Sequence, residues 1–203
     1  MSLLITLVIL IFSAIIHEIS HGLMAEKLGD DTAREQGRIT LNPIPHIDPM
    51  GSILVPVLVW IATGGRFMFG SAKPVPVNFN NLRSPRSGMA LVSLAGPLSN
   101  FGLAILFILP IKLGLANSIS YSILLQACLI NLVLGTFNLI PIPPLDGSKI
   151  LASLGSERFM YRLFSLERYG FILILLLLYT GILSLILVPV VSIFSSIFGV
   201  SFF

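Results

Sequence analysis

Charged side chains are scarce in this chain of 203 residues. Only 10% of the residues are Asp, Glu, Lys or Arg, whereas ordinary soluble domains carry about 25%. Hydrophobic residues make up 55%, and the mean hydropathy is +0.98. This composition argues against a soluble fold and predicts an all-α, multi-pass membrane protein. At about 20 residues per crossing, the length allows four to six transmembrane helices in a single domain, residues 1–203.

Cysteine is almost absent, and basic residues never gather into a patch. The one cysteine, Cys128, lies in an apolar run, so we expect a packed hydrophobic side chain and no disulfide framework. The twelve Lys and Arg residues lie singly between hydrophobic runs. This pattern argues against a nucleic-acid partner, and we interpret the basic residues as markers of membrane topology.

Four stretches are apolar enough to predict spanning helices. They cover residues 2–27, 87–111, 119–138 and 169 to about 189, and the last 14 residues are too few to cross again. A cleavable signal peptide is the alternative interpretation of the first stretch. It would need a basic start, and small residues where this chain has a polar cluster, so we favour a membrane helix.

A shorter apolar run, residues 51–63, contains Pro56 and is too short for a span. It fits a re-entrant or interfacial segment better. If it is re-entrant, eleven of the twelve Lys and Arg residues share one face of the membrane and only Lys112 is opposite. Because positively charged loops stay cytoplasmic, the N-terminus is then expected outside.

The first span contains His17-Glu18-Ile19-Ser20-His21. Helical geometry places His17 and His21 one turn apart on the same face, so both imidazoles can bind one metal ion. Glu18 lies about 100° further round the helix, where it can take a proton from water. Such a short pattern arises by chance, but buried polar groups in a spanning helix indicate a partner or an ion. Counting back from Lys27, His21 lies roughly 9 Å and His17 roughly 15 Å from the membrane boundary.

A catalytic zinc site usually has three protein ligands, and Asp146 is the best third candidate because it follows the inner end of the third span. An Asp-Gly pair is also a common turn or helix cap. However, Asn138 and three prolines precede it, a pattern typical of irregular backbone that lines a cavity. His46 and Asp48 are alternative ligands, unless they belong to a surface turn.

Three signatures together resemble the site-2 protease family of intramembrane zinc metalloproteases. They are HEISH at 17–21, GPLSN at 96–100 and NLIPIPPLDG at 138–147. They occur in the family's order, and the resemblance covers about residues 10–155. The stretches AKPVPVN at 72–78 and NPIPHIDPMG at 42–51 are similar to the compact subgroup. The chain has neither the PDZ domain nor the CBS domains of other members, so no nucleotide partner is expected.

The resemblance implies roles for individual residues. His17, His21 and Asp146 would bind one Zn²⁺ per chain, Glu18 would be the catalytic base, and Asn138 would help to bind the substrate carbonyl or backbone. It also implies that residues 36–63 form a β-hairpin and a membrane-dipping loop near the active site.

The expected function is hydrolysis of peptide bonds within or near transmembrane segments of membrane protein substrates. The enzyme would lie in the cell membrane, with its active site inside the bilayer near the cytoplasmic face. Ser13, one turn before His17, would line a path for water or bond back to its own helix.

Two other classes of function compete with the protease. One is a non-catalytic zinc-binding scaffold that binds transmembrane segments, against which the intact Glu18 argues. The other is a metal transporter or a histidine-rich oxidoreductase, for which three histidines and the lack of a repeat are poor support.

Overall fold

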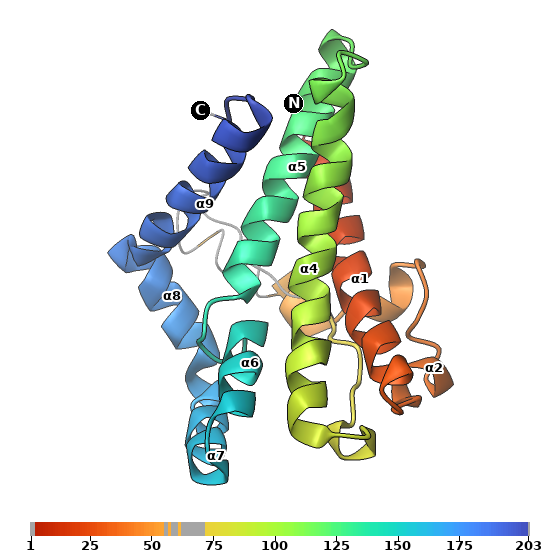
Figure 1. Ribbon diagram of the computed structural model, residues 1–203, viewed down its shortest axis with the longest axis vertical. Coiled ribbons are helices and arrows are strands. Elements are labelled where there is room, and N and C mark those ends of the chain that lie inside the picture. Colours follow the sequence, from red (N-terminus) through yellow and green to blue (C-terminus); the bar gives the residue numbers. More distant parts are fainter. Residues whose placement is uncertain (1–2, 55–56, 58–60, 62–71, 203) are drawn as a thin grey trace.

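Three long apolar helices form the body of the protein (Figure 1). The computed structural model describes residues 3–54, 57, 61 and 72–202. Helices α1 (Leu3–Lys27), α4 (Pro85–Lys112) and α5 (Ser118–Asn138) are each long and apolar enough to cross a membrane. They coincide with three of the four predicted spans. The residues described contain helices and irregular segments but no β-strand.

Helix α4 packs against both α1 and α5. A glycine allows the closest approach: a Cβ on Gly135 of α5 would lie only 3.1 Å from the carbonyl oxygen of Pro97 on α4. Small residues let helix backbones approach in this way inside membranes. Further along the same interface, Cys128 is fully buried in an apolar cluster with Ile108 and Leu132, as its apolar sequence context predicts.

The charged parts of the chain gather at one end of the bundle. The end of α1, helix α2 (Thr32–Glu35), the start of α4, α6 (Asp146–Leu154) and α7 (Glu157–Ser165) lie together there (Figure 1). These elements carry Lys27, Arg34, Arg86, Lys149, Arg158 and Arg162. Lys112 ends α4 at the opposite end. The arrangement has the asymmetry that the positive-inside rule requires.

The C-terminal region differs from the predicted single span ending near Pro189. Helix α8 (Gly170–Thr180) is followed by Gly181, and α9 (Ile182–Phe198) continues through Pro189 at an angle of 73° to the preceding helical stretch, Glu157–Leu177. Gly181 adopts a left-handed conformation (φ +73°) that ends helices readily because glycine lacks a Cβ. If the bent pair counts as one crossing, the described chain has four candidate spans, and otherwise three.

The predicted β-hairpin over residues 36–63 is wrong in the described part of that range. Residues 36–54 contain a 3₁₀ turn at Ile44–His46 and a π-helical turn at Pro49–Leu54, joined by irregular backbone. Pro43, Pro45 and Pro49 lack the N–H groups that a hairpin ladder needs. Most of the predicted re-entrant segment, residues 51–63, lies outside the described residues.

Asp30, just after α1, anchors the extended segment 72–78 that precedes α4. Its carboxylate is fully buried and accepts hydrogen bonds from the Asn78 backbone N–H (2.7 Å), the Asn81 amide (2.9 Å) and the Thr32 hydroxyl (2.5 Å). Burial raises the pKa of this carboxyl, but these hydrogen bonds outweigh burial and lower the pKa below its ordinary value of 3.8. The ionised Asp30 therefore stabilises the connection.

We expect Asp30→Ala to lower the free energy of unfolding by about 1–3 kcal/mol, because it leaves buried donors without an acceptor. Because the folded-state pKa is lowered, the charge contributes stability that is fully present above pH 3.8 and is lost as the pH falls through the folded-state pKa. Thermal unfolding of the native chain and the variant in detergent should therefore differ by a constant amount at neutral pH, and the gap should narrow below about pH 4. Asp31→Ala, at the exposed neighbouring acid, is the control and should change little. An equal loss in both variants would contradict the anchor.

Candidate metal centre

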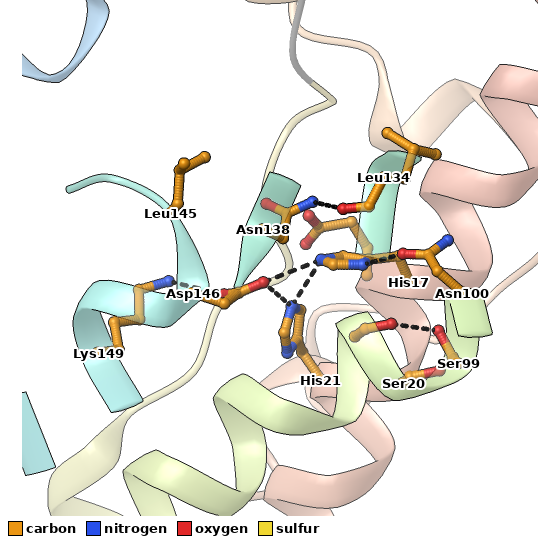
Figure 2. Close-up of polar contacts among 12 residues, drawn as sticks. His17, Ser20, His21, Ser99, Asn100, Leu134, Asn138, Leu145, Asp146 and Lys149 are labelled. Carbon is orange, nitrogen blue, oxygen red and sulfur yellow. Dashed lines mark hydrogen bonds and ion pairs between the residues drawn. The ribbon is translucent and has the colours of Figure 1, made fainter. Parts of the chain in front are cut away.

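Helices α1 and α6 bring three predicted ligands together (Figure 2). His17 and His21 are 6% and 8% exposed, and their Nε2 atoms lie 3.0 Å apart. Oδ2 of Asp146, which is 5% exposed, lies 3.1 Å from Nε2 of His17 and 3.2 Å from Nε2 of His21. Two residues of one helix turn and an acid more than 120 positions later thus converge on one buried point.

The outer nitrogens of both imidazoles contact oxygen atoms that can only accept a hydrogen bond. Nδ1 of His17 lies 2.6 Å from Oδ1 of Asn100, and Nδ1 of His21 lies 2.7 Å from the backbone carbonyl of Val92. Each Nδ1 therefore donates this hydrogen bond, and a neutral imidazole has no other ring proton. Consequently each Nε2 presents a lone pair toward Asp146.

Three acceptor atoms in mutual contact repel one another unless a cation lies among them. The separations of 3.0–3.2 Å approach the value of about 3.3 Å that follows from zinc bonds of about 2.05 Å in tetrahedral geometry. Two imidazoles and one carboxylate are also an established ligand set for catalytic zinc. Both the chemistry and the spacing of the donor atoms therefore fit a zinc ion with one position left open.

The approach of α4 to the imidazoles depends on Gly96. A Cβ at this position would lie 2.5 Å from Nε2 of His21 and 2.6 Å from Nε2 of His17. These distances are far below van der Waals contact, and the atoms concerned are the converging ones. Gly96 therefore leaves the space in which the metal and its ligands can fit.

Asp146 is the first residue of α6, but its side chain does not cap that helix. Its Oδ2 faces the imidazoles, and its Oδ1 lies 3.5 Å from Nζ of Lys149, one turn later. Gly147 allows α6 to begin against the end of α5, because a Cβ there would lie 2.2 Å from the carbonyl oxygen of Leu139. The turn or cap interpretation of Asp146 therefore does not describe this side chain.

A buried amide network supports His17 from behind, and sequence reasoning assigned no role to its two asparagines. Asn100 is fully buried and donates through Nδ2 to Oδ1 of Asn131 (3.0 Å). Asn131, also fully buried, donates to Oγ of Ser13 (2.9 Å) and to the carbonyl of Ala127 (2.9 Å). The available signal was an asparagine inside a span, which indicates a polar partner. Ser13 is thus bonded to α5 and not to its own helix.

Glu18 and Asn138 make contacts of their own. Glu18 is partly buried, and its Oε2 accepts a hydrogen bond from the backbone N–H of Val75 (2.7 Å). Asn138, at the end of α5, donates through Nδ2 to the carbonyl of Leu134 (3.0 Å) on its own helix (Figure 2). No other described residue accepts a hydrogen bond from this amide group, which has a second N–H.

His46 and Asp48, the alternative ligands, do not join the group. Nε2 of His46 is bonded to the carbonyl of Thr40 (2.9 Å), and Oδ2 of Asp48 accepts from the N–H of Gly51 (2.6 Å). Within the described residues, His17, His21 and Asp146 are the only His, Cys, Asp or Glu side chains that cluster as metal ligands could.

Comparisons with known proteins agree with this geometry. The sequence model of the family described as Peptidase family M50 matches residues 110–180. YwhC of Bacillus subtilis, a candidate zinc metalloprotease, is 41% identical over 192 residues, covering 90% of this chain and 84% of its own length. Rip2 of Mycolicibacterium smegmatis, another candidate zinc metalloprotease, is 31% identical over 86% of this chain and 66% of its own.

A more distant relative is archaeal. The zinc metalloprotease MJ0392 of Methanocaldococcus jannaschii is 28% identical over 92% of this chain and 46% of its own length. No solved structure matches the chain. The similarity to YwhC extends over most of both proteins, and the chain therefore belongs to the M50, or site-2 protease, family of zinc metalloproteases.

Proposed function

We propose that this metalloprotease hydrolyses peptide bonds within or near transmembrane segments of membrane protein substrates. One observation carries the proposal: the buried group of His17, His21 and Asp146 lies beside helices that are long and apolar enough to span a bilayer. A substrate bond must therefore reach a point among these helices. The bonds most readily brought there are those of another membrane segment.

In this proposal His17, His21 and Asp146 hold one Zn²⁺ per chain. When bound, zinc supplies a Lewis acid that polarises a peptide carbonyl and lowers the pKa of water toward about 7. Asn100 and the Val92 carbonyl keep each imidazole in the tautomer and orientation that direct Nε2 inward.

Glu18 is the proposed general base and acid. Its carboxylate takes a proton from the attacking water and passes it to the departing amine, so that one water molecule is consumed for each bond that breaks. The second N–H of the Asn138 amide is the proposed donor to the substrate carbonyl or backbone. Glu18 directly follows the ligand His17 in α1, and Asn138 is the last residue of α5.

The substrate's own structure sets a requirement. A helix hides its carbonyl groups in hydrogen bonds, so the segment to be cut must unwind locally before a carbonyl reaches the site. We further propose that the site faces the cytoplasmic half of the bilayer, because the basic residues gather at the end of the bundle near the last turns of α1.

Glu18→Gln tests the chemistry. We expect the variant to retain zinc, because the three ligands are unchanged, and to lose at least about 100-fold in kcat on membrane-spanning test peptides, since it cannot accept the proton. Zinc analysis of the detergent-purified chain and a cleavage assay measure the two outcomes. Glu26→Gln, the same change at a partly exposed acid later on α1 that pairs with Arg34 away from the site, is the control and should cut normally.

The same measurements separate a protease from a non-catalytic scaffold. If the native chain binds zinc and membrane peptides but cuts none, and Glu18→Gln behaves identically, the scaffold replaces the enzyme. If the purified native chain takes up no zinc, the proposed centre is wrong.

Gly96→Ala tests the space around the ligands. The added methyl group would overlap both imidazoles, so we expect zinc retained after dialysis to fall at least about tenfold. Gly102→Ala on the same helix places its methyl group in open space and should bind zinc normally. Equal zinc content in the two variants would contradict the tight approach of α4.

Asn100→Leu tests the support behind His17. Removing the acceptor for Nδ1 should weaken zinc binding about 10- to 100-fold, the usual effect of losing a residue that orients a ligand. Competition with a zinc chelator measures the affinity. Gln126→Leu is the matched control, since Gln126 is also an amide in a span and donates to the Thr6 hydroxyl away from the site (2.7 Å); a comparable loss there would argue against a specific role for Asn100.

A further inference from the structure

A short extended segment lies against α1 beside Glu18. We call residues 73–76 the strap. The backbone N–H of Val75 donates to Oε2 of Glu18 (2.7 Å), and Val75 is 6% exposed. Gly22, one turn after Glu18, makes room for the strap, since a Cβ there would lie 3.1 Å from Cγ1 of Val75. The strap therefore lies directly on the helix face that presents Glu18.

The strap sequence, Lys73-Pro74-Val75-Pro76, makes this contact rigid and unique. Proline fixes its own φ and holds the preceding residue in an extended conformation, which restricts Lys73 and Val75. Pro74 and Pro76 have no N–H. The N–H of Val75 is therefore the one backbone donor between residues 74 and 76, and it is directed at Glu18.

Arg38 holds the strap from the other side. Its side chain is buried, with 7% of the residue exposed, and Nη2 donates to the carbonyls of Lys73 (2.8 Å) and Pro74 (3.2 Å). The N–H of Lys73 donates to the carbonyl of His46 (2.8 Å). Both hydrogen-bonding groups of residue 73 are thus occupied just before the residue that contacts Glu18.

These contacts leave the two carboxylate oxygens of Glu18 in different states. Oε2 is held by Val75, whereas Oε1 accepts no hydrogen bond from any residue that the structure describes. A carboxylate held at one oxygen cannot rotate freely, and its second oxygen stays available to a proton from water.

We propose that the strap is a positioning device for Glu18: Arg38 fixes the strap, and the N–H of Val75 orients the carboxylate. The inference rests on the proposed function, because it requires Glu18 to be the base. Arg38 and Val75 touch neither substrate nor zinc in this role. It also explains why an arginine is buried next to two carbonyl groups, where its charge needs acceptors.

Val75→Pro is the sharpest test, because it removes the single N–H and keeps an extended, apolar residue. We expect kcat on a membrane-spanning peptide to fall about 10- to 100-fold, with KM and zinc content unchanged. Val77→Pro makes the same change two residues later, where the N–H donates to no described residue, and should cut at the native rate. Val75→Ala keeps the N–H and should retain most activity.

Arg38 provides a second, independent measurement. Arg38→Met keeps the length of the side chain but has no donor, so kcat should fall about tenfold or more with zinc retained. Arg38→Lys restores one donor and should recover part of the loss. A purely structural role would instead lower zinc content or thermal stability together with activity.

Two results would overturn the inference. One is a native kcat in Val75→Pro, and the other is a loss that Val77→Pro shares or that follows the loss of zinc. Glu18→Gln, assayed in parallel, separates this inference from the function itself. If Glu18→Gln is inactive while Val75→Pro cuts normally, the strap fails and the protease stands; if Glu18→Gln cuts normally, Glu18 is not the base and both fail.

Discussion

Mutual repulsion among three buried acceptor atoms is the constraint on which the rest of the structure depends. Two Nε2 atoms and one carboxylate oxygen lie 3.0–3.2 Å from one another in the interior of the bundle. In a low-dielectric interior such an arrangement is destabilising unless a cation or an added proton lies among the three atoms. The chain must also prevent the groups from turning away, and it does so with acceptors behind both imidazoles and with Lys149 beside Asp146. The electrostatic requirement at one point thus determines which side chains the neighbouring helices carry.

Three polar side chains inside the bundle are paired with one another in a manner that suits a membrane. Asn100, Asn131 and Ser13 connect α4, α5 and α1 through hydrogen bonds among fully or nearly fully buried atoms. In hydrocarbon an amide without a hydrogen-bond partner would destabilise the fold by several kcal/mol. The network therefore has two effects that cannot be separated. It fixes the register of three helices, and it holds His17 in the orientation that binding a metal requires.

The sequence predicts best those features that depend on local geometry. A spacing of four along one helix places His17 and His21 on one face whatever surrounds them, and long uncharged runs identify α1, α4 and α5. Asp146 could be predicted as a ligand from the sequence because it follows the inner end of a span. The role of Asn100 could not be predicted, since an amide in a span indicates that a polar partner exists but does not identify it. The strap contacts Glu18 and Arg38, which lie in two distant stretches of the sequence. The helix breaks at Gly181 rather than Pro189 because Gly181 is left-handed, a conformation that no sequence periodicity reveals. The β-hairpin was inferred from resemblance, and the prolines of this chain argue against it locally.

The positions that build the site most directly have no side chain at all. Gly96 brings α4 against the imidazoles, Gly147 brings α6 against the end of α5, and Gly22 brings the strap against the helix that carries Glu18. Each allows a backbone to approach to a distance that a methyl group would forbid, as small residues do throughout membrane bundles. A ligand set can be read from the residues that bear nitrogen and oxygen, but the space that lets them converge is set by these glycines. It follows that adding a single carbon at Gly96 should disturb metal binding as strongly as removing a residue that orients a ligand, although it removes no polar atom.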